Sequence, residues 1–411
     1  MEDKFKIAIV SDAYGHSDNE KEIVTNGTVR FSGEVAVSAH QFSSEIRLLT
    51  TSPSYHAFGN KIINVLKTER FVYNNLPKSS QTHGGIAEEG IKKHLSFFSP
   101  NVVSLSTIGA PNATVAQKWA TENNIPCVAT VHSHPENIIR HSLVEMGYPY
   151  ESIIKIAEKT RQRIQRLSSE LQAIIVRSSV SQIELQKYGL QGNFKVLRGG
   201  VDKDTFCPSE SEEEVFTLRE KFGLDIKDIL LLFVGRFCPA KSSDSVIQIL
   251  RELRNINKNI KLVVVGDYSH YKFELRELKN TGVHFLGELK KQDVADVMKT
   301  VDIGIAPSTE ETFGQGIAEM MSSELVCAVP NIGGHMEFAR TNSSLMLDPF
   351  NKEKPENWVN IIYHYLINPH LRKNVGEMAR KQVNTINESY QHFIDIHKEV
   401  YENFIAPIDV S

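Results

Sequence analysis

The sequence has few of the features that mark disulfide-rich, membrane or secreted proteins. It holds only four cysteines in 411 residues, and Cys127 and Cys327 lie inside apolar runs, where a buried thiol acts as a small hydrophobe. No stretch approaches the roughly 18 consecutive apolar residues of a membrane-spanning helix. The chain opens with charge and a short apolar run broken at Ser11 and Asp12, unlike a secretory signal. We therefore expect a soluble protein of a reduced, cytoplasmic compartment.

An excess of charge of one sign is also missing. The 46 Lys and Arg residues oppose 50 Asp and Glu residues, for a net charge of -4 at pH 7. This balance offers no sequence-wide attraction to nucleic acid or to anionic lipid. Any anion site must be local, and no nucleic-acid partner is expected.

The length and the hydrophobic pattern together predict two domains. A chain of 411 residues is too long for one ordinary core, so two domains of roughly 200 residues each are expected. Short β-branched runs alternate with longer amphipathic segments, which is typical of strand–helix–strand units on a parallel sheet. The polar, turn-rich stretch from Gly199 to Glu214 interrupts this pattern, and we place the linker there. Expected strands lie at 6–10, 46–50, 102–105, 127–131 and 173–176, and again at 229–234, 260–265, 283–286, 303–306 and 325–329.

The predicted fold is therefore α/β, with two Rossmann-like, doubly wound parallel-sheet domains that face each other across a cleft. We assign residues 1–200 to the N-terminal domain and residues 201–385 to the C-terminal domain. The helical spacing near the end of the chain predicts a C-terminal helix over 386–411, which we expect to cross back to the N-terminal domain.

The turn after the first strand of the second half is a candidate phosphate site. It begins at Gly235 and places Arg236 and Lys241 just beyond the strand, where ligands of open parallel sheets collect. Arg offers a planar fork of donors and Lys a mobile point charge, so the two can neutralise a diphosphate without a metal ion. The same pair is also compatible with solvated loop cations.

A second candidate site is the segment from Ala306 to Met321, which follows another strand. Its turn opens a helix whose free N–H groups can bind an anion, and glycine lets a ligand approach the backbone closely. Glu311 and Glu319 stand on either side of that helix start and can grip two parts of one ligand, because carboxylates accept hydrogen bonds from paired hydroxyls. Taken alone, they are also compatible with a cap and a surface charge. The predicted contacts inside the segment are Glu311, Thr312, Phe313, Gly314, Gln315, Gly316 and Glu319.

The order of these motifs resembles the retaining glycosyltransferases of family 4 (glycosyl transferases group 1), whose mark is a Glu, seven residues and a second Glu after a Pro-Ser turn. The resemblance covers nearly the whole chain and includes Val265-Gly266-Asp267 and Phe285-Leu286-Gly287. It implies the GT-B fold. It also implies that Arg236 and Lys241 contact the diphosphate, Glu311 the transferred sugar and Glu319 the ribose, with Gly287 along the base.

In the first half the chain is similar to the α-mannosyl and sulfoquinovosyl transferase branch of that family. The loop at Asn26-Gly27-Thr28 resembles the loop after the branch's first strand, which implies a donor contact at Gly27. Val131-His132 resembles its strand ending in a histidine, which implies a role for His132 in the cleft near the donor sugar. Arg198 to Asp202 resembles its Arg-Gly-Val-Asp linker.

These resemblances imply transfer of a hexose from a UDP-sugar or GDP-mannose to a hydroxyl of a glycan, lipid or small molecule, with retention of configuration. We predict no metal and no cofactor, because the one Asp-x-Asp, at Asp202 and Asp204, lies in the linker without a preceding strand. Catalytic roles are predicted for His132, Arg236, Lys241 and Glu311. Departure of the nucleoside diphosphate charges the β-phosphate, at which Arg236, Lys241 and the amides of Gly314 to Gly316 are aimed.

Two other functions remain open. One is a catalytically silent sugar-nucleotide-binding partner subunit. The other is a dinucleotide-binding oxidoreductase, against which the missing G-x-G-x-x-G after the first strand argues. Separately, Lys155, Lys159, Arg163 and Arg166 form a basic stripe at helical spacing, which is compatible with a solvated face and with peripheral docking on anionic lipid.

Overall fold

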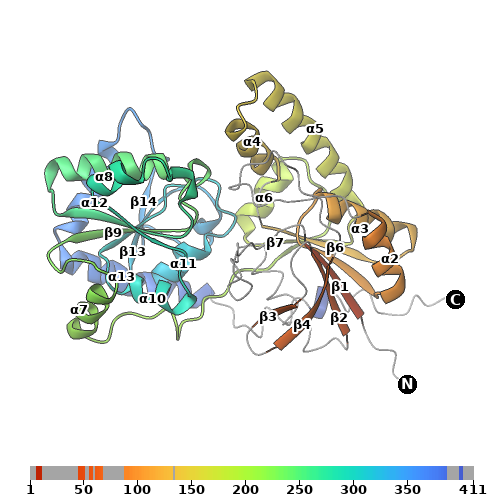
Figure 1. The fold of residues 1–411 in the computed structure, drawn as a ribbon, viewed down its shortest axis with the longest axis horizontal. Helices are drawn as coiled ribbons and strands as arrows, with labels where there is room; N and C mark the ends of the chain where they lie inside the picture. Colours follow the sequence, from red (N-terminus) through yellow and green to blue (C-terminus); the bar gives the residue numbers. More distant parts are fainter. Residues whose placement is uncertain are drawn as a thin grey trace. The chain divides into compact units, whose positions relative to one another are not determined.

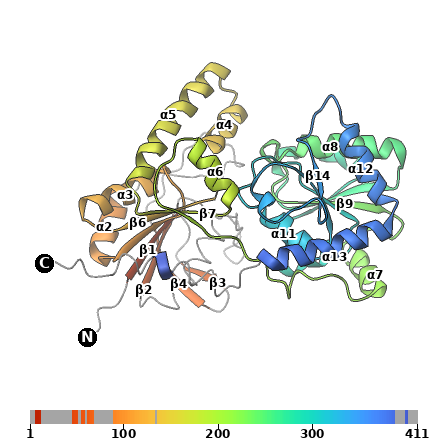
Figure 2. The same ribbon diagram turned by 180° about the vertical axis from the view of Figure 1, so that it is seen from behind.

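The computed structural model describes residues 6–11, 45–50, 55–58, 61–67, 88–132, 135–386 and 398–400. Contacts within the chain divide it into two units (Figures 1 and 2). One comprises Met1–Leu197 with the end of the chain from Ser389, and the other is Arg198–Glu388. Within the described ranges, none of the helices has both the length and the apolar composition that crossing a bilayer requires.

The first unit is built on a sheet whose described strands run in the order β3-β4-β2-β1-β5-β6-β7-β8. All neighbouring pairs are parallel except β3 with β4. The order reverses between β1 and β5, which is where ligands of such sheets collect. The strands are β1 Lys6–Ser11, β2 Glu45–Thr50, β3 Tyr55–Phe58, β4 Lys61–Lys67, β5 Val102–Leu105, β6 Cys127–Val131, β7 Ala173–Val176 and β8 Phe194–Val196.

Helices cover the sheet of the first unit and bury its apolar side chains. Every residue of β5, β6 and β7 is buried, as expected for parallel strands covered on both faces. Ile91 and Leu95 of one covering helix and Trp119 of the next pack into the same core. The described helices are α2 Glu88–Phe98, α3 Pro111–Glu122, α4 Pro135–Glu145, α5 Tyr150–Ser169 and α6 Ser179–Lys187.

The second unit contains a parallel sheet of described strands in the order β11-β10-β9-β12-β13-β14. Buried apolar clusters lie on both faces of this sheet, one under α8 and α12 and the other under α10, α11 and α13. The order reverses between β9 and β12, so the loops that follow these two strands lie at a switch point. The strands are β9 Ile229–Val234, β10 Ile260–Val265, β11 Val283–Gly287, β12 Ile303–Ile305, β13 Val326–Pro330 and β14 Leu345–Leu347.

Long and short helices alternate with these strands. The α-helices are α7 Glu212–Lys221, α8 Ser243–Ile256, α9 Leu275–Asn280, α10 Lys291–Met298, α11 Gln315–Ser322, α12 Glu356–Leu366 and α13 Pro369–Ile386. Three 3₁₀ turns are described as well, η1 Pro239–Lys241, η2 Ser269–Tyr271 and η3 Gly334–Glu337. η1 and η3 belong to loops that build the candidate site.

The sequence prediction of two parallel-sheet units is confirmed, and the expected strands agree with the observed ones to within a residue or two at their ends. The stretch 199–214, where the sequence predicts the linker, lies in the second unit, which begins at Arg198. Val201 and Phe206 are buried in that unit's core, and Arg380 donates a hydrogen bond to the carbonyl oxygen of Phe206 at 3.0 Å. The polar residues around them concealed these two apolar anchors.

Most of the predicted helix over 386–411 lies outside the described residues. Lys398–Val400 are described and are helical. Glu399 lies 3.5 Å from Lys195 of β8, and Val400 is buried. This part of the chain therefore contacts the first unit.

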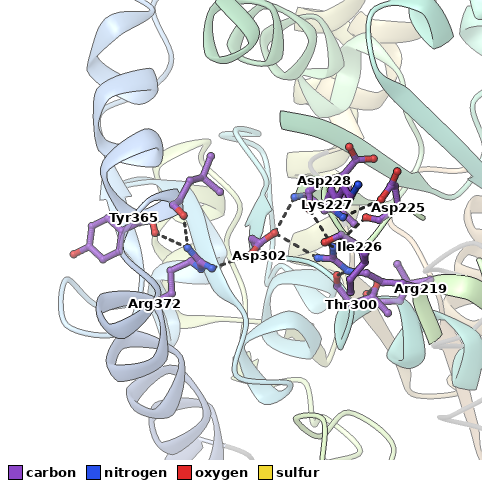
Figure 3. A network of polar contacts seen from close by, with 12 residues as sticks. Arg219, Asp225, Ile226, Lys227, Asp228, Thr300, Asp302, Tyr365 and Arg372 are labelled. Atoms are coloured by element: carbon purple, nitrogen blue, oxygen red, sulfur yellow. Dashed lines mark hydrogen bonds and ion pairs between the residues drawn. The ribbon is translucent and has the colours of Figure 1, made fainter. Parts of the chain in front are cut away.

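A polar network joins the amino ends of β9 and β12 in the second unit (Figure 3). The carboxylate of Asp302 accepts a hydrogen bond from the Leu230 amide at 2.9 Å and pairs with Arg372 at 2.8 Å and with Arg219 at 3.6 Å. Both guanidinium groups also donate hydrogen bonds to main-chain carbonyls. Arg219 donates to those of Thr300, Asp225, Ile226 and Asp228. Arg372 donates to those of Tyr365 and Leu366. The network ties α7, the sheet and the α12–α13 junction together.

Candidate functional site

Two glycine turns lie against each other at the carboxyl edge of the second sheet. Gly235 follows β9 with a φ of 134° and donates its amide N–H to the Val265 carbonyl at 2.9 Å. A Cβ on Gly266, after β10, would lie 2.2 Å from the carbonyl oxygen of Gly235, so no side chain fits there. Gly266 in turn donates to the carbonyl of Gly287 at 2.8 Å. The predicted contacts Gly235 and Gly287 are thus brought together through Gly266.

The loop after β9 carries the two predicted phosphate-binding cations. Arg236 is exposed, and Phe237 beside it is fully buried and anchors the loop. The chain then forms η1, which ends at Lys241. Ser242 has a left-handed backbone with φ 57°, and α8 begins directly after it. The loop therefore presents both cations from a backbone fixed between β9 and α8.

Lys241 reaches across the switch point to Glu311, which follows β12. The Nζ to Oε1 distance is 2.7 Å, and the exposed fractions of the two side chains are 33% and 19%. Burial alone raises the pKa of Glu311, but the charge and hydrogen bond of Lys241, with smaller effects of His335 and Ser308, lower it below its ordinary value. Glu311 is therefore ionised at neutral pH and can act only as a hydrogen-bond acceptor.

Between Glu311 and α11 the loop presents backbone rather than side chains. Phe313 is buried, with its ring centroid 5.0 Å from that of Phe338, so it anchors the loop to the core. Gly314 has φ 84° and occupies the N-cap position of α11, where its added Cβ would lie 3.0 Å from Cβ of His335. Gly316 lies near the end of β9, and a Cβ added to it would lie 3.7 Å from the carbonyl oxygen of Val234. The free amides at the start of α11 therefore open at the edge that carries Lys241.

The structure places Glu319 and Gln315 on one side of α11. Glu319 is buried, with an exposed fraction of 6%. The Gln315 amide donates to the Glu319 carboxylate at 3.3 Å and to the Gly200 carbonyl at 3.0 Å. Gln315 thus connects the helix start to the irregular segment at the beginning of the second unit. Thr312 lies between Glu311 and Phe313 and is half-buried.

A third loop of the site was not assigned a role from the sequence. It follows β13 and contains Gly334, whose amide donates to the Glu311 carbonyl at 2.5 Å and whose added Cβ would lie 2.0 Å from the carbonyl oxygen of Thr312. His335 is fully buried next to it, and its Nε2 lies 2.7 Å from the Pro330 carbonyl. Burial lowers the pKa of His335, although the Pro330 carbonyl and Glu311 act in the opposite direction. His335 is therefore neutral at pH 7, and its Nε2 donates to Pro330.

A signal for this third loop was present in the sequence. Gly333 and Gly334 follow a strongly apolar run, as Gly235 follows β9, and such turns gather at one edge of a parallel sheet. Glu337 in the same loop pairs with Arg198 at 2.6 Å, which holds the loop to the first residue of the second unit.

Among the predicted site residues of the first unit, the structure describes His132. His132 follows β6 and is half-buried. Burial, and to a smaller degree the positive charge of Arg177, lower the pKa of His132 to about 3, so its imidazole is neutral at pH 7. Gly27 and the loop around it lie outside the described residues.

Asp202 has a role in holding the local backbone. It accepts hydrogen bonds from the amide and hydroxyl of Thr205 and lies 2.7 Å from Lys291. Among the residues that the structure describes, no group of three or more His, Cys, Asp or Glu side chains is arranged to hold a metal ion.

Comparison with known proteins shows which families and folds this chain is similar to. Residues 214–382 match the family Glycosyl transferases group 1. A GDP-mannose-dependent alpha-mannosyltransferase of Corynebacterium glutamicum is 24% identical over 349 residues, which are 84% of this chain and 76% of that protein. A sulfoquinovosyl transferase of Arabidopsis thaliana is 22% identical over 348 residues, 83% of this chain and 64% of that one. Sucrose-phosphate synthase from Thermosynechococcus elongatus has a similar structure, with a TM-score of 0.75 and 15% identity over 98% of this chain and 100% of that one.

The two Rossmann-like units have the GT-B fold. The family match and the similar curated proteins show that the chain is a glycosyltransferase. The match to the family Glycosyl transferases group 1 lies within the second unit, at residues 214–382, and the similar proteins include the mannosyl and sulfoquinovosyl transferases named above. The sequence predictions of a Glycosyl transferases group 1 domain and of a transferase enzyme are confirmed. Membership of family 4 and retention of configuration stay predictions.

Proposed function

We propose that the chain moves a hexose from a nucleoside-diphosphate sugar, either a UDP-sugar or GDP-mannose, to a hydroxyl of a glycan, lipid or small molecule. The observation that carries this proposal is the Lys241–Glu311 pair at the switch point, 2.7 Å between charges beside the amides of the α11 start. The name of the Corynebacterium glutamicum relative supports GDP-mannose as one of the donors to examine first.

In this proposal the two charges of the pair take different parts of the donor. The Lys241 ammonium, with Arg236 and the amides of Gly314 to Gly316, stabilises the charge that develops on the leaving β-phosphate. The ionised Glu311 accepts hydrogen bonds from hydroxyls of the transferred sugar, since a carboxylate held below its ordinary pKa stays an acceptor. Glu319 would receive the ribose hydroxyls, and Gly287 would lie along the base.

We propose retention of configuration by attack on the face of the sugar from which the diphosphate departs. The acceptor oxygen bonds to the anomeric carbon as the bond to the phosphate oxygen breaks, and the leaving phosphate takes the acceptor proton. A neutral His132 would contribute hydrogen bonding to the donor sugar rather than a positive charge. Proton NMR of the first product decides this point, because an inverted anomer contradicts it.

No metal ion or cofactor is part of the proposed reaction, since Arg236, Lys241 and the helix amides supply the neutralising groups. Full activity in excess chelator is expected, and activity that disappears in chelator and returns with Mg²⁺ or Mn²⁺ contradicts the metal-independent mechanism.

We also propose a cytoplasmic location with peripheral contact at a membrane.

A nucleotide-release assay tests the main proposal. The purified full chain is incubated with UDP-glucose, UDP-galactose and GDP-mannose, and release of UDP or GDP is followed with and without simple hydroxyl acceptors. Glu311→Gln should lower kcat/KM by about 10²-fold, as expected for loss of charge-assisted hydrogen bonds in a transition state. Glu353→Gln, an exposed carboxylate of the same unit, is the matched control and should keep the wild-type rate. Equal rates in the two variants contradict the assigned role of Glu311.

A catalytically silent partner subunit is the less favoured alternative, because the charged pair and the helix-start amides are all in place. It predicts that Glu311→Ala leaves the biological role of the chain intact, whereas the proposed activity predicts that the variant abolishes it.

A further inference from the structure

Helices α4 and α5 form a hairpin that extends from the sheet of the first unit in both ribbon views (Figures 1 and 2). The closed end of this hairpin is the turn at 146–149. Gly147 lies there with φ 72°, and a Cβ added to it would meet no atom within 4 Å. A side chain at this position would therefore meet open space.

Large apolar side chains are exposed around this turn. Val144 of α4 is 62% exposed, Tyr148 of the turn 44%, and Tyr150 and Ile154 of α5 74% and 50%. Tyr150 and Ile154 are four residues apart, so they share one face of the helix. These four exposed side chains lie within eleven residues around the turn, and we call them the hairpin tip.

Basic side chains continue from the hairpin tip along α5. Lys155, Lys159, Arg163 and Arg166 are exposed, whereas the opposite face buries Ile153, Ala157, Ile164 and Leu167 in the core. The exposed face also carries Glu151 and Glu158, and Glu158 lies 3.5 Å from Arg161. The exposed side of α5 thus carries these four cations and two carboxylates, and Arg161 lies beside one of the carboxylates, Glu158.

We propose that the hairpin tip docks on an anionic lipid bilayer. Tyr148 and Tyr150 have the apolar ring and polar hydroxyl that suit the headgroup level, Val144 and Ile154 enter the acyl boundary, and Lys155 and Lys159 meet lipid phosphates. The neighbouring cations favour this occupant over an uncharged or basic protein surface, because they complement the negative leaflet and their long stems can lie along it.

The proposal deepens the peripheral membrane contact of the proposed function by naming its surface and its lipid class. It does not depend on catalysis. Binding to lipid and release of nucleotide are separate readouts, so Glu311→Gln should keep full vesicle binding while it loses transfer. Loss of one without the other shows which of the two proposals fails.

Sedimentation of the full chain with sucrose-loaded vesicles tests the proposal. Vesicles of phosphatidylcholine alone are compared with vesicles in which about one third is phosphatidylglycerol, at low and high salt. We expect binding to the anionic vesicles only, and a bound fraction that falls as salt rises. The double variants Tyr150→Ser with Ile154→Ser and Lys155→Glu with Lys159→Glu should each reduce binding at least about fivefold.

Matched controls lie on other helices of the same unit. Phe97→Ser removes an apolar side chain that is 78% exposed on α2, and Lys93→Glu with Lys118→Glu reverses two exposed cations. Both should bind as the wild type does, and circular dichroism with thermal melting verifies that every variant is folded. The proposal is overturned if anionic vesicles do not sediment the chain, or if the controls weaken binding as much as the tip variants. Self-association without lipid that Tyr150→Ser abolishes also overturns it, because the tip then serves a second copy of the chain.

Discussion

The two edges of the second sheet both hold ionic groups, yet they hold them in different ways. At the amino edge, Asp302 lies between Arg219 and Arg372, and the remaining guanidinium N–H groups go to main-chain carbonyls (Figure 3). At the carboxyl edge, Lys241 meets Glu311 while a third of its side chain stays exposed. The carboxylates of Asp302 and Glu311 are equally exposed, at 19%. The edges therefore differ in what surrounds the carboxylate, and this difference separates a pair that stabilises the fold from one that can exchange its partner for a ligand.

The largest expected effect is a loss of stability when the ionic network at the amino edge is disrupted. Asp302→Ala leaves two guanidinium groups and the Leu230 amide without their common acceptor, and should lower the free energy of unfolding by about 3–5 kcal/mol. Urea denaturation followed by circular dichroism measures it. Asp293→Ala, which breaks a more exposed pair with Lys221, should cost less than about 1 kcal/mol. Equal losses in the two variants remove the structural role assigned to the network.

The next effect concerns the carboxyl edge and should appear in catalysis. Lys241→Gln removes the ammonium that is proposed to stabilise the leaving phosphate, and kcat/KM for nucleotide release should fall by about 10²-fold or more. The urea midpoint should shift far less than in Asp302→Ala. If Lys241→Gln lowers stability but leaves kcat/KM unchanged, the Lys241–Glu311 pair stabilises the fold as the Asp302 network does. That result contradicts the difference drawn between the two edges.

A smaller effect separates two glycines of one turn. Gly314→Ala forces a side chain onto a residue at φ 84° and against His335, so we expect a loss of about 1–2 kcal/mol in stability and weaker donor binding. Gly316→Ala meets only ordinary contacts and should fold like the wild type. Thermal melting and calorimetric titration with UDP and GDP compare the two, and an equal response in both variants excludes the backbone conformation as the cause.

The smallest effect at neutral pH is a change in pH dependence. Lys241 lowers the pKa of Glu311 below its ordinary value of 4.5. Ionisation of this carboxyl group therefore stabilises the folded protein relative to the unfolded chain. This contribution to stability is full above pH 4.5 and is lost as pH falls through the lowered pKa. In Lys241→Gln the acid limb of kcat/KM should move to higher pH than in the wild type. An acid limb at the same pH in both proteins contradicts the coupling.

The sheets and the glycine turns were accessible from the sequence because both rest on local patterns. Apolar runs such as 229–234 and 260–265 are long enough to read as strands, and Gly235 or Gly314 mark the turns that a side chain would obstruct. The sequence predicted ligand contacts at both Lys241 and Glu311, but not their ion pair. The pair follows from the observed order of the strands, since the loops after the neighbouring strands β9 and β12 meet at one edge of the sheet.

The amino-edge network could not be predicted in this way. Arg219 lies in a helix rich in charge, which reads as a solvated face, and its partners lie up to 83 positions away at Asp302. His335 was missed for a related reason. Its hydrogen bond to Pro330 is local, but its contact with the loop of Glu311 depends on how the β13 loop folds back over that loop.

The Lys241–Glu311 pair has a consequence for selectivity. Without a ligand, the Lys241 ammonium and the Glu311 carboxylate are paired with each other. An anion such as inorganic phosphate can bind the ammonium only if the carboxylate loses this partner, which costs free energy. A free sugar meets the reverse cost at the ammonium. In the proposed function, a ligand that carries both phosphate and hydroxyls would satisfy both groups at once. The pair would therefore favour the complete donor over inorganic phosphate or a free sugar.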